Sequence, residues 1–107
     1  MPYKRERLEE LIREMAARFL EEESSGISMI TVTRVETSKD KKEARIFFTV
    51  LPQEKEKAAL DFAKRKSGLC RDYIVKHTRI GRPPRVKFFI DQGEKNRQRI
   101  DFLSQND

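Results

Sequence analysis

The sequence contains very few of the residues from which metal sites and covalently reactive centres are built. Its 107 residues include one cysteine, Cys70, one histidine, His77, and no tryptophan. A single cysteine excludes an internal disulfide and the cysteine-rich zinc motifs, and a single histidine excludes a histidine cluster. Cys70 and His77 are seven residues apart, about two helical turns, too far for a direct hydrogen bond along one helix. We therefore predict no catalytic residue, no metal and no cofactor, and we expect a protein that is not an enzyme.

Long apolar runs and nucleotide-binding loops are also absent. No apolar run approaches the roughly 18 residues that span a bilayer, and the first residues lack the apolar core of a signal peptide. No phosphate-binding loop or dinucleotide motif is present. We expect a soluble, cytoplasmic monomer with no membrane partner and no small-molecule substrate. Its length fits a single domain, residues 1–107, with residues 104–107 expected to fray.

The positive charge is concentrated in one segment. The chain has 24 basic and 18 acidic residues, and nine of the basic but only one of the acidic residues fall between Lys64 and Lys87. That segment therefore carries a net +8, and the rest of the chain a net −2. Such asymmetry is typical of a surface that binds a polyanion, although a run of charge can also be only a solvated face.

Hydrophobic periodicity predicts an α+β fold with four helices and three strands. The helices are expected at 3–23, 52–65 and 69–77 and after Asp91, and the strands at 27–37, 43–51 and 85–90. The first strand alternates imperfectly around Arg34, which predicts a bulge or a strong twist there. In the third helix the expected apolar stripe is Leu69, Tyr73, Ile74 and His77, and in the last helix Ile100 and Leu103 are the expected apolar anchors. Three strands in so short a chain predict a mixed sheet with the helices packed on one face.

Ser67 and Gly68 interrupt the helical pattern in the middle of the basic segment and predict a kink between two helices. Small residues at such a break let a phosphate backbone approach closely, and the amides that begin the next helix point outward to meet it. The basic residues around this break and along the next helix are candidates for phosphate or sugar contact. The candidate RNA-binding residues are Lys64, Arg65, Lys66, Ser67, Gly68, Arg71, Lys76, Arg79 and Arg82.

Other interpretations of these residues remain open. Phe47 and Phe89 alternate with Arg45 and Lys87 on the second face of the sheet, as in base-stacking platforms, so the protein could be a general single-stranded RNA binder. The same phenylalanines could instead form a cross-strand pair covered by the last helix or by a partner. His77 could be a partly buried helix residue or an auxiliary phosphate contact. Cys70 fits a helix-packing role better than a reactive thiolate. The basic surface could also dock an acidic protein as an adaptor.

The order and spacing of these segments resemble the ribosome-binding factor A family over nearly the whole chain. The residues that carry the resemblance are Thr31, Val32, Thr33, Val35, Ser38, Asp40, Ala44, Gly68, Arg71, Pro84, Val86, Phe88 and Asp91. The resemblance implies a type II KH-like domain in which an Ala-x-Gly kink between the second and third helices replaces the glycine loop. It further implies a non-catalytic assembly factor that binds the free small (30S) ribosomal subunit and its 16S rRNA during late maturation and rRNA processing, and that supports cold adaptation.

The chain departs from the family pattern at three places. The kink alanine corresponds to Lys66, so the motif here is Lys-Ser-Gly, which could alter the kink or add a cation. The arginine three residues before the proline corresponds to Gly81, and Arg79 and Arg82 flank it and could substitute for it. The sequence also ends soon after the last expected helix, so contacts made by a longer C-terminal tail are not expected.

Overall fold

The computed structural model describes residues 3–24, 26 and 28–105, and for residues 99–105 it describes the backbone alone. The predicted order of helices and strands is confirmed. The elements are α1 Arg5–Glu23, β1 Met29–Thr37, β2 Glu43–Leu51, the short 3-10 helix η1 Gln53–Lys55, α2 Glu56–Arg65, α3 Ser67–His77, β3 Arg85–Ile90 and α4 Gln92–Gln105. The expected anchors Ile100 and Leu103 lie outside the described side chains.

Helix α1 is amphipathic and buries one stripe of its surface. Its fully buried or nearly buried residues are Leu8, Ile12, Met15, Ala16, Phe19 and Leu20, a helical spacing that places all of them on one face. The helix ends where the Ser24 N–H donates to the Leu20 carbonyl at 2.9 Å. Gly26 then adopts φ +79°, a left-handed conformation that glycine reaches without steric cost. The chain can thus reverse and enter β1.

The sheet has the strand order β1-β2-β3, with β1 antiparallel and β3 parallel to β2. The register of β1 on β2 shifts between Val32 and Arg34, so the predicted bulge is confirmed. The extra residue reverses the alternation of side chains between the two faces of the sheet for the residues that follow it. Val32 and Val35 are therefore both buried although they are three residues apart. The bulge lets one short strand keep its apolar residues on the core side.

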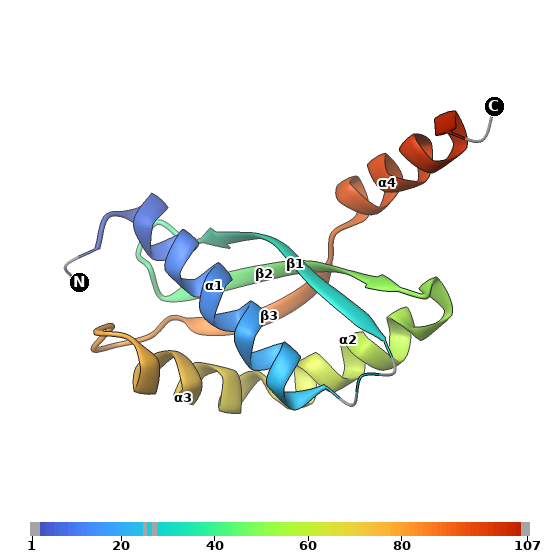
Figure 1. The fold of residues 1–107 in the computed structure, drawn as a ribbon. Coiled ribbons are helices and arrows are strands. Elements are labelled where there is room, and N and C mark those ends of the chain that lie inside the picture. The colour runs from blue at the N-terminus through green and yellow to red at the C-terminus, as the bar shows by residue number, and fades with distance from the viewer. Residues whose placement is uncertain (1–2, 25, 27, 106–107) are drawn as a thin grey trace.

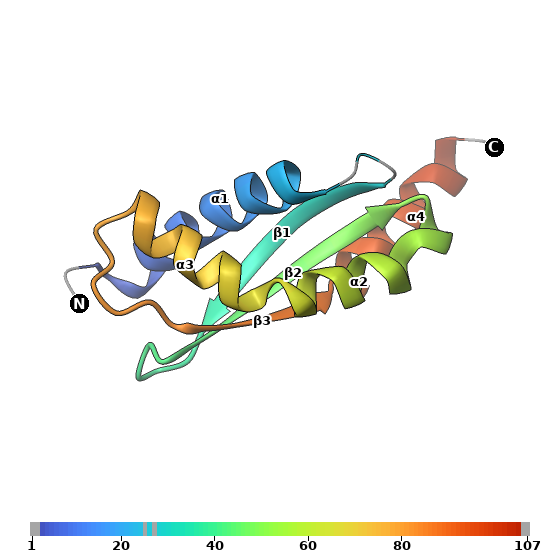
Figure 2. The same ribbon diagram turned by 90° about the horizontal axis from the view of Figure 1, so that it is seen from below.

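Helices α1, α2 and α3 cover one face of the sheet, whereas α4 extends away from it (Figure 1). The expectation that the helices pack on one face therefore holds for three of the four. Helix α4 is joined to the body near its start, where Lys95 Nζ lies 3.1 Å from Glu56 Oε2 on α2. Viewed from below, α2 and α3 follow one another end to end in front of the strands, with a bend where they meet (Figure 2). No helix in the described part of the chain is long and apolar enough to cross a membrane.

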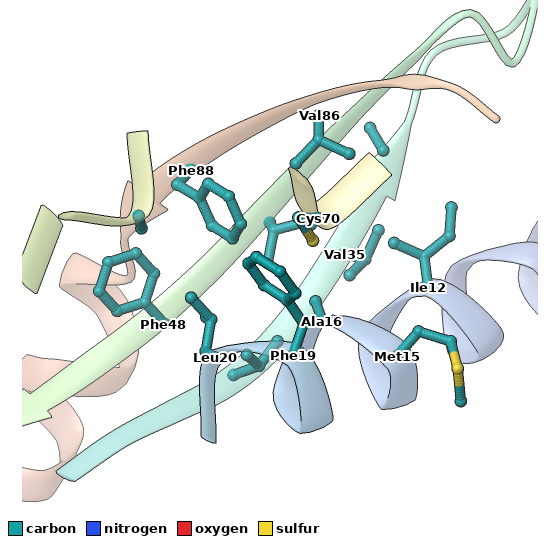
Figure 3. Close-up of a cluster of buried hydrophobic side chains, with 14 of the residues drawn as sticks. Ile12, Met15, Ala16, Phe19, Leu20, Val35, Phe48, Cys70, Val86 and Phe88 are labelled. Atoms are coloured by element: carbon teal, nitrogen blue, oxygen red, sulfur yellow. The ribbon is translucent and has the colours of Figure 1, made fainter. Parts of the chain in front are cut away.

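The hydrophobic core lies between α1, the inner face of the sheet, and the helix pair α2–α3 (Figure 3). Phe48 and Phe88, neighbours on β2 and β3, pack edge to face with ring centroids 6.1 Å apart, a favoured aromatic geometry. Cys70 of α3 is completely buried in the same cluster. These contacts fix α3 against the sheet, so the basic residues on its outer side have a rigid support.

The apolar stripe expected along α3 is partly wrong. The pattern of Leu69, Tyr73, Ile74 and His77 predicted a face that includes Leu69, but Leu69 is 52% exposed. The buried positions are Cys70 and Ile74, which are four residues apart and lie one above the other. The helix therefore turns a narrow face to the core and leaves most of its surface to solvent.

Candidate nucleic-acid interface

The junction between α2 and α3 is a break of one residue at Lys66. This residue has φ −95° and ψ 5°, which lies in a region that residues other than glycine can adopt. Its N–H donates to the carbonyls of Phe62 and Ala63, both at 3.1 Å, and its carbonyl accepts the Cys70 N–H at 2.8 Å. The two helices are therefore joined without a loop, and the change of direction is held by backbone hydrogen bonds.

The sequence placed this break one residue too late. Ser67 and Gly68 lie in the first turn of α3, beyond the break. The φ of Gly68 is not positive, and a Cβ built there would meet nothing within 4 Å. The backbone shape therefore does not require glycine at this position. What the glycine does provide is an exposed stretch of backbone without a side chain, open to close approach by a ligand.

The three cations next to the break differ in their surroundings. Lys64 and Arg65 are exposed. Lys66 Nζ lies 3.8 Å from Glu23 Oε2 on α1 and 6.0 Å from the centre of the Phe62 ring. Partly exposed ion pairs of this kind contribute little stability. The contact nevertheless directs the Lys66 side chain toward α1.

Three of the predicted arginines gather in one recess beyond the kink. Arg71, Arg79 and Arg82 line a depression of about 1030 Å³ together with Gly81 and Pro83. The guanidinium of Arg71 donates to the Pro83 carbonyl through Nε at 3.4 Å and Nη2 at 3.2 Å. This contact ties α3 to the segment that leads into β3. The structure thus brings together arginines that are up to 11 residues apart in the sequence.

Lys76 does not belong to this recess. It lines a separate groove between α1 and α3, with Glu22, Glu23 and Asp72 among its neighbours. The basic residues predicted along and beyond α3 are therefore divided between two sides of this helix. Arg71, Arg79 and Arg82 lie on one side, and Lys76 lies with acidic groups on the other.

Cys70 and His77 show no arrangement for covalent chemistry. Burial raises the pKa of the Cys70 thiol to about 12, so it stays protonated near neutral pH. His77 is exposed, its Nδ1 lies 2.9 Å from the Tyr73 carbonyl, and its ring stacks on Tyr73 with centroids 4.0 Å apart. Among the described residues, no group of three or more histidine, cysteine, aspartate and glutamate side chains is placed to hold a metal ion.

Comparison with known proteins identifies the family. The sequence model of ribosome-binding factor A matches residues 4–104. The chain belongs to the ribosome-binding factor A family. It is 38% identical to ribosome-binding factor A of Fervidobacterium nodosum over 74 residues, covering 68% of this chain and 59% of that protein. It is 34% identical to the Thermodesulfovibrio yellowstonii factor over 105 residues, covering 95% of this chain and 89% of that one.

Solved structures of ribosome-binding factor A share the fold. The crystal structure of the Thermus thermophilus factor superimposes with a TM-score of 0.73 at 20% identity, covering 81% of this chain and 94% of that chain. A homology model of the same factor, fitted into a cryo-EM map of its complex with the 30S subunit, gives 0.69 at 21% identity, covering 78% and 90%. The fold is thus the KH-like fold of this family, with a kinked helix pair at the position of the glycine loop.

Two departures from the pattern of ribosome-binding factor A now have a structural context. The break itself falls on Lys66, the position at which the family pattern has alanine. Its side chain is directed to Glu23, so the additional cation has a partner within the protein, and its contact with RNA stays a prediction. Gly81 replaces the arginine expected before the proline, and both flanking arginines, Arg79 and Arg82, line the recess beside it.

The open face of the sheet is not covered by α4. Phe47 and Phe89 are register partners on β2 and β3, with ring centroids 5.5 Å apart. The guanidinium of Arg34 lies 3.9 Å from the centre of the Phe47 ring, a cation–π contact. Phe89 remains 39% exposed. The expectation of an aromatic cross-strand pair is confirmed. The side chain that packs on this pair is Arg34 from the bulge, and the expectation that the last helix covers it is wrong.

Sequence reasoning missed three cations that line the same recess. Lys41 and Lys42 come from the turn between β1 and β2, and Arg85 is the first residue of β3. The turn lies outside the basic segment of the sequence, which concealed its place beside that segment in the fold. The parallel pairing of β3 with β2 could have shown it, because Glu43 is the register partner of Arg85.

Proposed function

We propose that this protein binds the small ribosomal subunit and its 16S rRNA during late maturation of the subunit and rRNA processing, as a non-catalytic assembly factor. The observation that carries the proposal is the clustering of basic side chains beyond the α2–α3 kink in a member of the ribosome-binding factor A family. The Thermus thermophilus relative has been fitted into the map of a 30S complex. We further propose a single-domain, cytoplasmic protein that acts during cold adaptation.

The charges at this site favour a polyanion over a compact ligand. Lys64, Arg65, Arg71, Arg79 and Arg82 are all exposed and follow the outside of the helix pair and its exit. RNA presents phosphates at regular spacing, so cations spread along a surface can each neutralise one. The A-form groove and phosphate backbone are recognised largely by shape and charge. The predicted site residues are therefore the proposed RNA contacts, and Lys66 and Lys76 lie at the edge of this site.

The proposal that the factor is non-catalytic rests on the chemistry of its reactive side chains. The thiol of Cys70 is buried and its pKa is raised to about 12. A thiol that remains protonated is a poor nucleophile. The His77 ring is engaged with Tyr73 through both stacking and Nδ1. Binding and positioning of RNA need neither group.

A second candidate function uses the open sheet face. Phe89 is 39% exposed beside Phe47, and Arg45 and Lys87 lie on the same face, which suits the stacking of unpaired bases. The Arg34 guanidinium already occupies one face of Phe47, so less aromatic surface remains for a base. We therefore favour the kinked-helix side. Reversing the charge of Arg71 and Arg79 should abolish RNA binding on that side, and Phe89→Ser should leave it unchanged.

Ribosome fractionation tests the proposed function directly. Tagged protein expressed in cells should co-migrate with free small subunits in a sucrose gradient, and the Arg71→Glu/Arg79→Glu variant should remain at the top of the gradient. Thermal melting of the variant checks that it is folded, so that a loss of co-migration reports a loss of binding. Wild-type protein that co-migrates with translating ribosomes, or with no ribosomal particle, would refute the proposal.

A salt titration separates RNA binding from docking on an acidic protein. Five phosphate contacts on single-stranded rRNA would give a log–log slope of affinity against salt of about −3.5, at roughly −0.7 for each contact. The measurement uses the wild-type protein and a 16S rRNA transcript over a salt series. A flat response would exclude counterion release and leave the adaptor function as the better explanation.

A further inference from the structure

The recess beside α3 is built from two segments that lie far apart in the sequence. One is the turn Asp40–Lys42 between β1 and β2, and the other is the segment 79–85 that leads into β3. The Arg85 N–H donates to the Lys42 carbonyl at 2.8 Å, so the parallel pairing of the strands holds the two segments side by side. Both ribbon views place the turn and the α3–β3 connection at the same end of the molecule (Figures 1 and 2).

Six basic side chains line this recess, and a single acidic one. The cations are Lys41, Lys42, Arg71, Arg79, Arg82 and Arg85. The acid, Asp40, accepts hydrogen bonds from Ser38 Oγ at 2.6 Å and the Lys42 N–H at 3.0 Å. The bond from Ser38, then that from the Lys42 amide, lower its pKa. Its charge is therefore kept at the turn it stabilises, and the recess retains a strong positive excess.

Within residues 3–24, 26 and 28–98, whose side chains the structure describes, none of the six cations forms an ion pair. Arg71 donates to the Pro83 carbonyl, and Lys41 Nζ donates to the Tyr3 carbonyl at 3.0 Å. Elsewhere, Arg5, Arg13, Arg34 and Lys95 all pair with carboxylates. Uncompensated like charges repel each other, so this cluster is suited to an anion from outside the chain.

The backbone that presents these cations is held firmly. Ile80 and Pro84 are both buried, one near each end of the α3–β3 connection. Thr78 Oγ1 donates to the Ile74 carbonyl at 2.6 Å and accepts the Ile80 N–H at 3.2 Å. Arg71 fixes the Pro83 carbonyl between them. A site organised before binding loses less conformational entropy when the ligand arrives.

We infer that this recess is an anion seat for RNA phosphates at a place where the strand bends sharply or ends, an inference that rests on the proposed function. An extended strand laid on a flat surface meets cations from one side only. Here cations approach from the β1–β2 turn, from α3 and from the α3–β3 connection, an arrangement that fits phosphates drawn together by a bend or a terminal phosphate. The recess, at about 1030 Å³, lies at the upper end of the usual range for small-ligand pockets, about 300–1,000 Å³.

A matched pair of double variants tests the seat. Lys42→Gln/Arg82→Gln removes two exposed cations of the recess without touching a described side-chain hydrogen bond. Lys39→Gln/Lys57→Gln removes two exposed cations outside it, one of them on the same β1–β2 turn. Each variant is titrated with a 16S rRNA transcript over a salt series. The recess variant should reduce the magnitude of the log–log slope by about 1.4, at roughly 0.7 for each phosphate that is no longer neutralised, and the control should keep the wild-type slope.

The two outcomes of failure are distinct. If the wild-type protein does not bind the transcript or small subunits at all, the proposed function fails. If the wild-type protein binds and the two double variants behave alike, the function stands and the recess is not the phosphate seat. Thermal melting of both variants confirms that each is folded.

The source of the phosphate is resolved with a short single-stranded oligonucleotide made with and without a terminal phosphate. A preference for the phosphorylated form that disappears in Lys42→Gln/Arg82→Gln indicates that the recess takes a strand end. Equal affinity for both forms, weakened equally by the variant, indicates that it takes backbone phosphates at a bend. If the variant leaves the affinity for both oligonucleotides and for the transcript unchanged, the inference is overturned.

Discussion

Gly68 illustrates how a residue can matter for access and not for shape. Its φ is not positive, and an added Cβ would have no neighbour within 4 Å. The break between the helices falls before it, at Lys66, in a conformation that residues other than glycine can adopt. The lack of a side chain at Gly68 therefore has no folding role in this chain, and its effect lies at the surface that a ligand would meet.

Gly68→Ala is expected to separate stability from binding. Because Gly68 lies inside the first turn of α3, alanine should leave the free energy of unfolding unchanged or raise it by up to about 1 kcal/mol. If the RNA backbone approaches closely here, the added methyl group should weaken binding to small subunits. Thermal melting and a subunit-binding assay measure the two effects. Unchanged affinity would mean that the RNA passes the helix junction at a distance.

Cys70 provides a test of core packing at the level of one atom. The residue is completely buried, and burial raises the pKa of its thiol from 9.0 to about 12. A thiol-reactive dye that attacks the thiolate should not label the native protein at neutral pH, and should label it fully in denaturant. Because the chain has one cysteine, the signal has a single source. Rapid labelling of the native protein would show that α3 leaves the sheet readily.

The same thiol makes stability dependent on alkaline pH. The folded pKa lies above the unfolded value, so the unfolded chain loses its proton first as pH rises. The stabilisation is therefore complete below about pH 9 and declines as the pH rises toward 12. Denaturant unfolding measured from pH 8 upward should show a fall in the free energy of unfolding that Cys70→Ala reduces. Equal pH dependence in both proteins would assign the alkaline loss to other groups.

At the scale of elements, Asp91 joins the bulge of β1 to the start of α4. Its carboxylate accepts hydrogen bonds from Thr33 Oγ1 at 2.6 Å, Arg34 Nε at 3.3 Å and the Glu94 N–H at 3.0 Å. Burial alone would raise the pKa of Asp91, but these hydrogen bonds and the charge of Arg34 hold it below its ordinary value of 3.8. One side chain thus caps a helix and fixes the residue that a bulge leaves unpaired.

Asp91→Asn should isolate the contribution of this charge. Asparagine caps helices about as well as aspartate, so the contact with Glu94 can persist while the charge is lost. The expected cost is about 1 kcal/mol at pH 7, since hydrogen bonds to a charged group exceed neutral ones by about that amount. Denaturant unfolding measures this cost. Asp61→Asn, at an exposed position, is the control and should change stability by less than about 0.5 kcal/mol.

The pH dependence of that difference has a definite sign. A carboxyl whose folded pKa is lowered stabilises the protein above its unfolded value and loses this effect as pH falls through the folded pKa. The gap between wild type and Asp91→Asn should therefore be constant at neutral pH and close as the pH falls below about 3.8. A gap that persists in strong acid would mean that the substitution disturbs packing and not the charge.

Local sequence patterns were sufficient to predict most helices and strands. They failed to predict which residues are buried where packing against other helices or strands decides the burial. The alternation of Ala44, Ile46 and Phe48 predicts β2 because a strand with one covered face repeats every second residue, and all three are fully buried. The irregularity at Arg34 predicted the bulge for the same reason. Leu69 was misplaced because α3 is covered on a narrow face by the sheet and α1, which its own sequence does not specify.

The candidate site was predicted in part for a similar physical reason. Arg71, Arg79 and Arg82 belong to one segment whose excess charge is visible in the sequence. Lys41 and Lys42 join them through the pairing of β2 with β3, a contact between segments about 40 residues apart. Lys76 does not line the recess, because the 3.6-residue turn of α3 directs its side chain to the other side of the helix. Charge density along the chain thus predicts that a site exists, and only topology selects its members.

At the scale of the whole molecule, folding and binding draw on different parts of the chain. The core lies between the inner face of the sheet and helices α1, α2 and α3, while the six cations of the recess gather at one end. Such a cluster destabilises the free protein by self-repulsion, which a bound anion would relieve. The folded protein should therefore become more stable when the charge of this cluster is removed or screened.

The melting temperature of the free protein should report this repulsion. Raising the ionic strength shortens the Debye length from about 30 Å at 0.01 M to about 8 Å at 0.15 M, so the wild-type melting temperature should rise with salt. At low salt, Lys42→Gln/Arg82→Gln should melt a few degrees above the wild type and lose this advantage at high salt, although it binds RNA less well. Lys39→Gln/Lys57→Gln loses the same charge outside the recess and should gain less. A recess variant less stable than wild type at every salt concentration would show that these side chains contribute packing to the fold, and their clustering would then need no external anion to explain it.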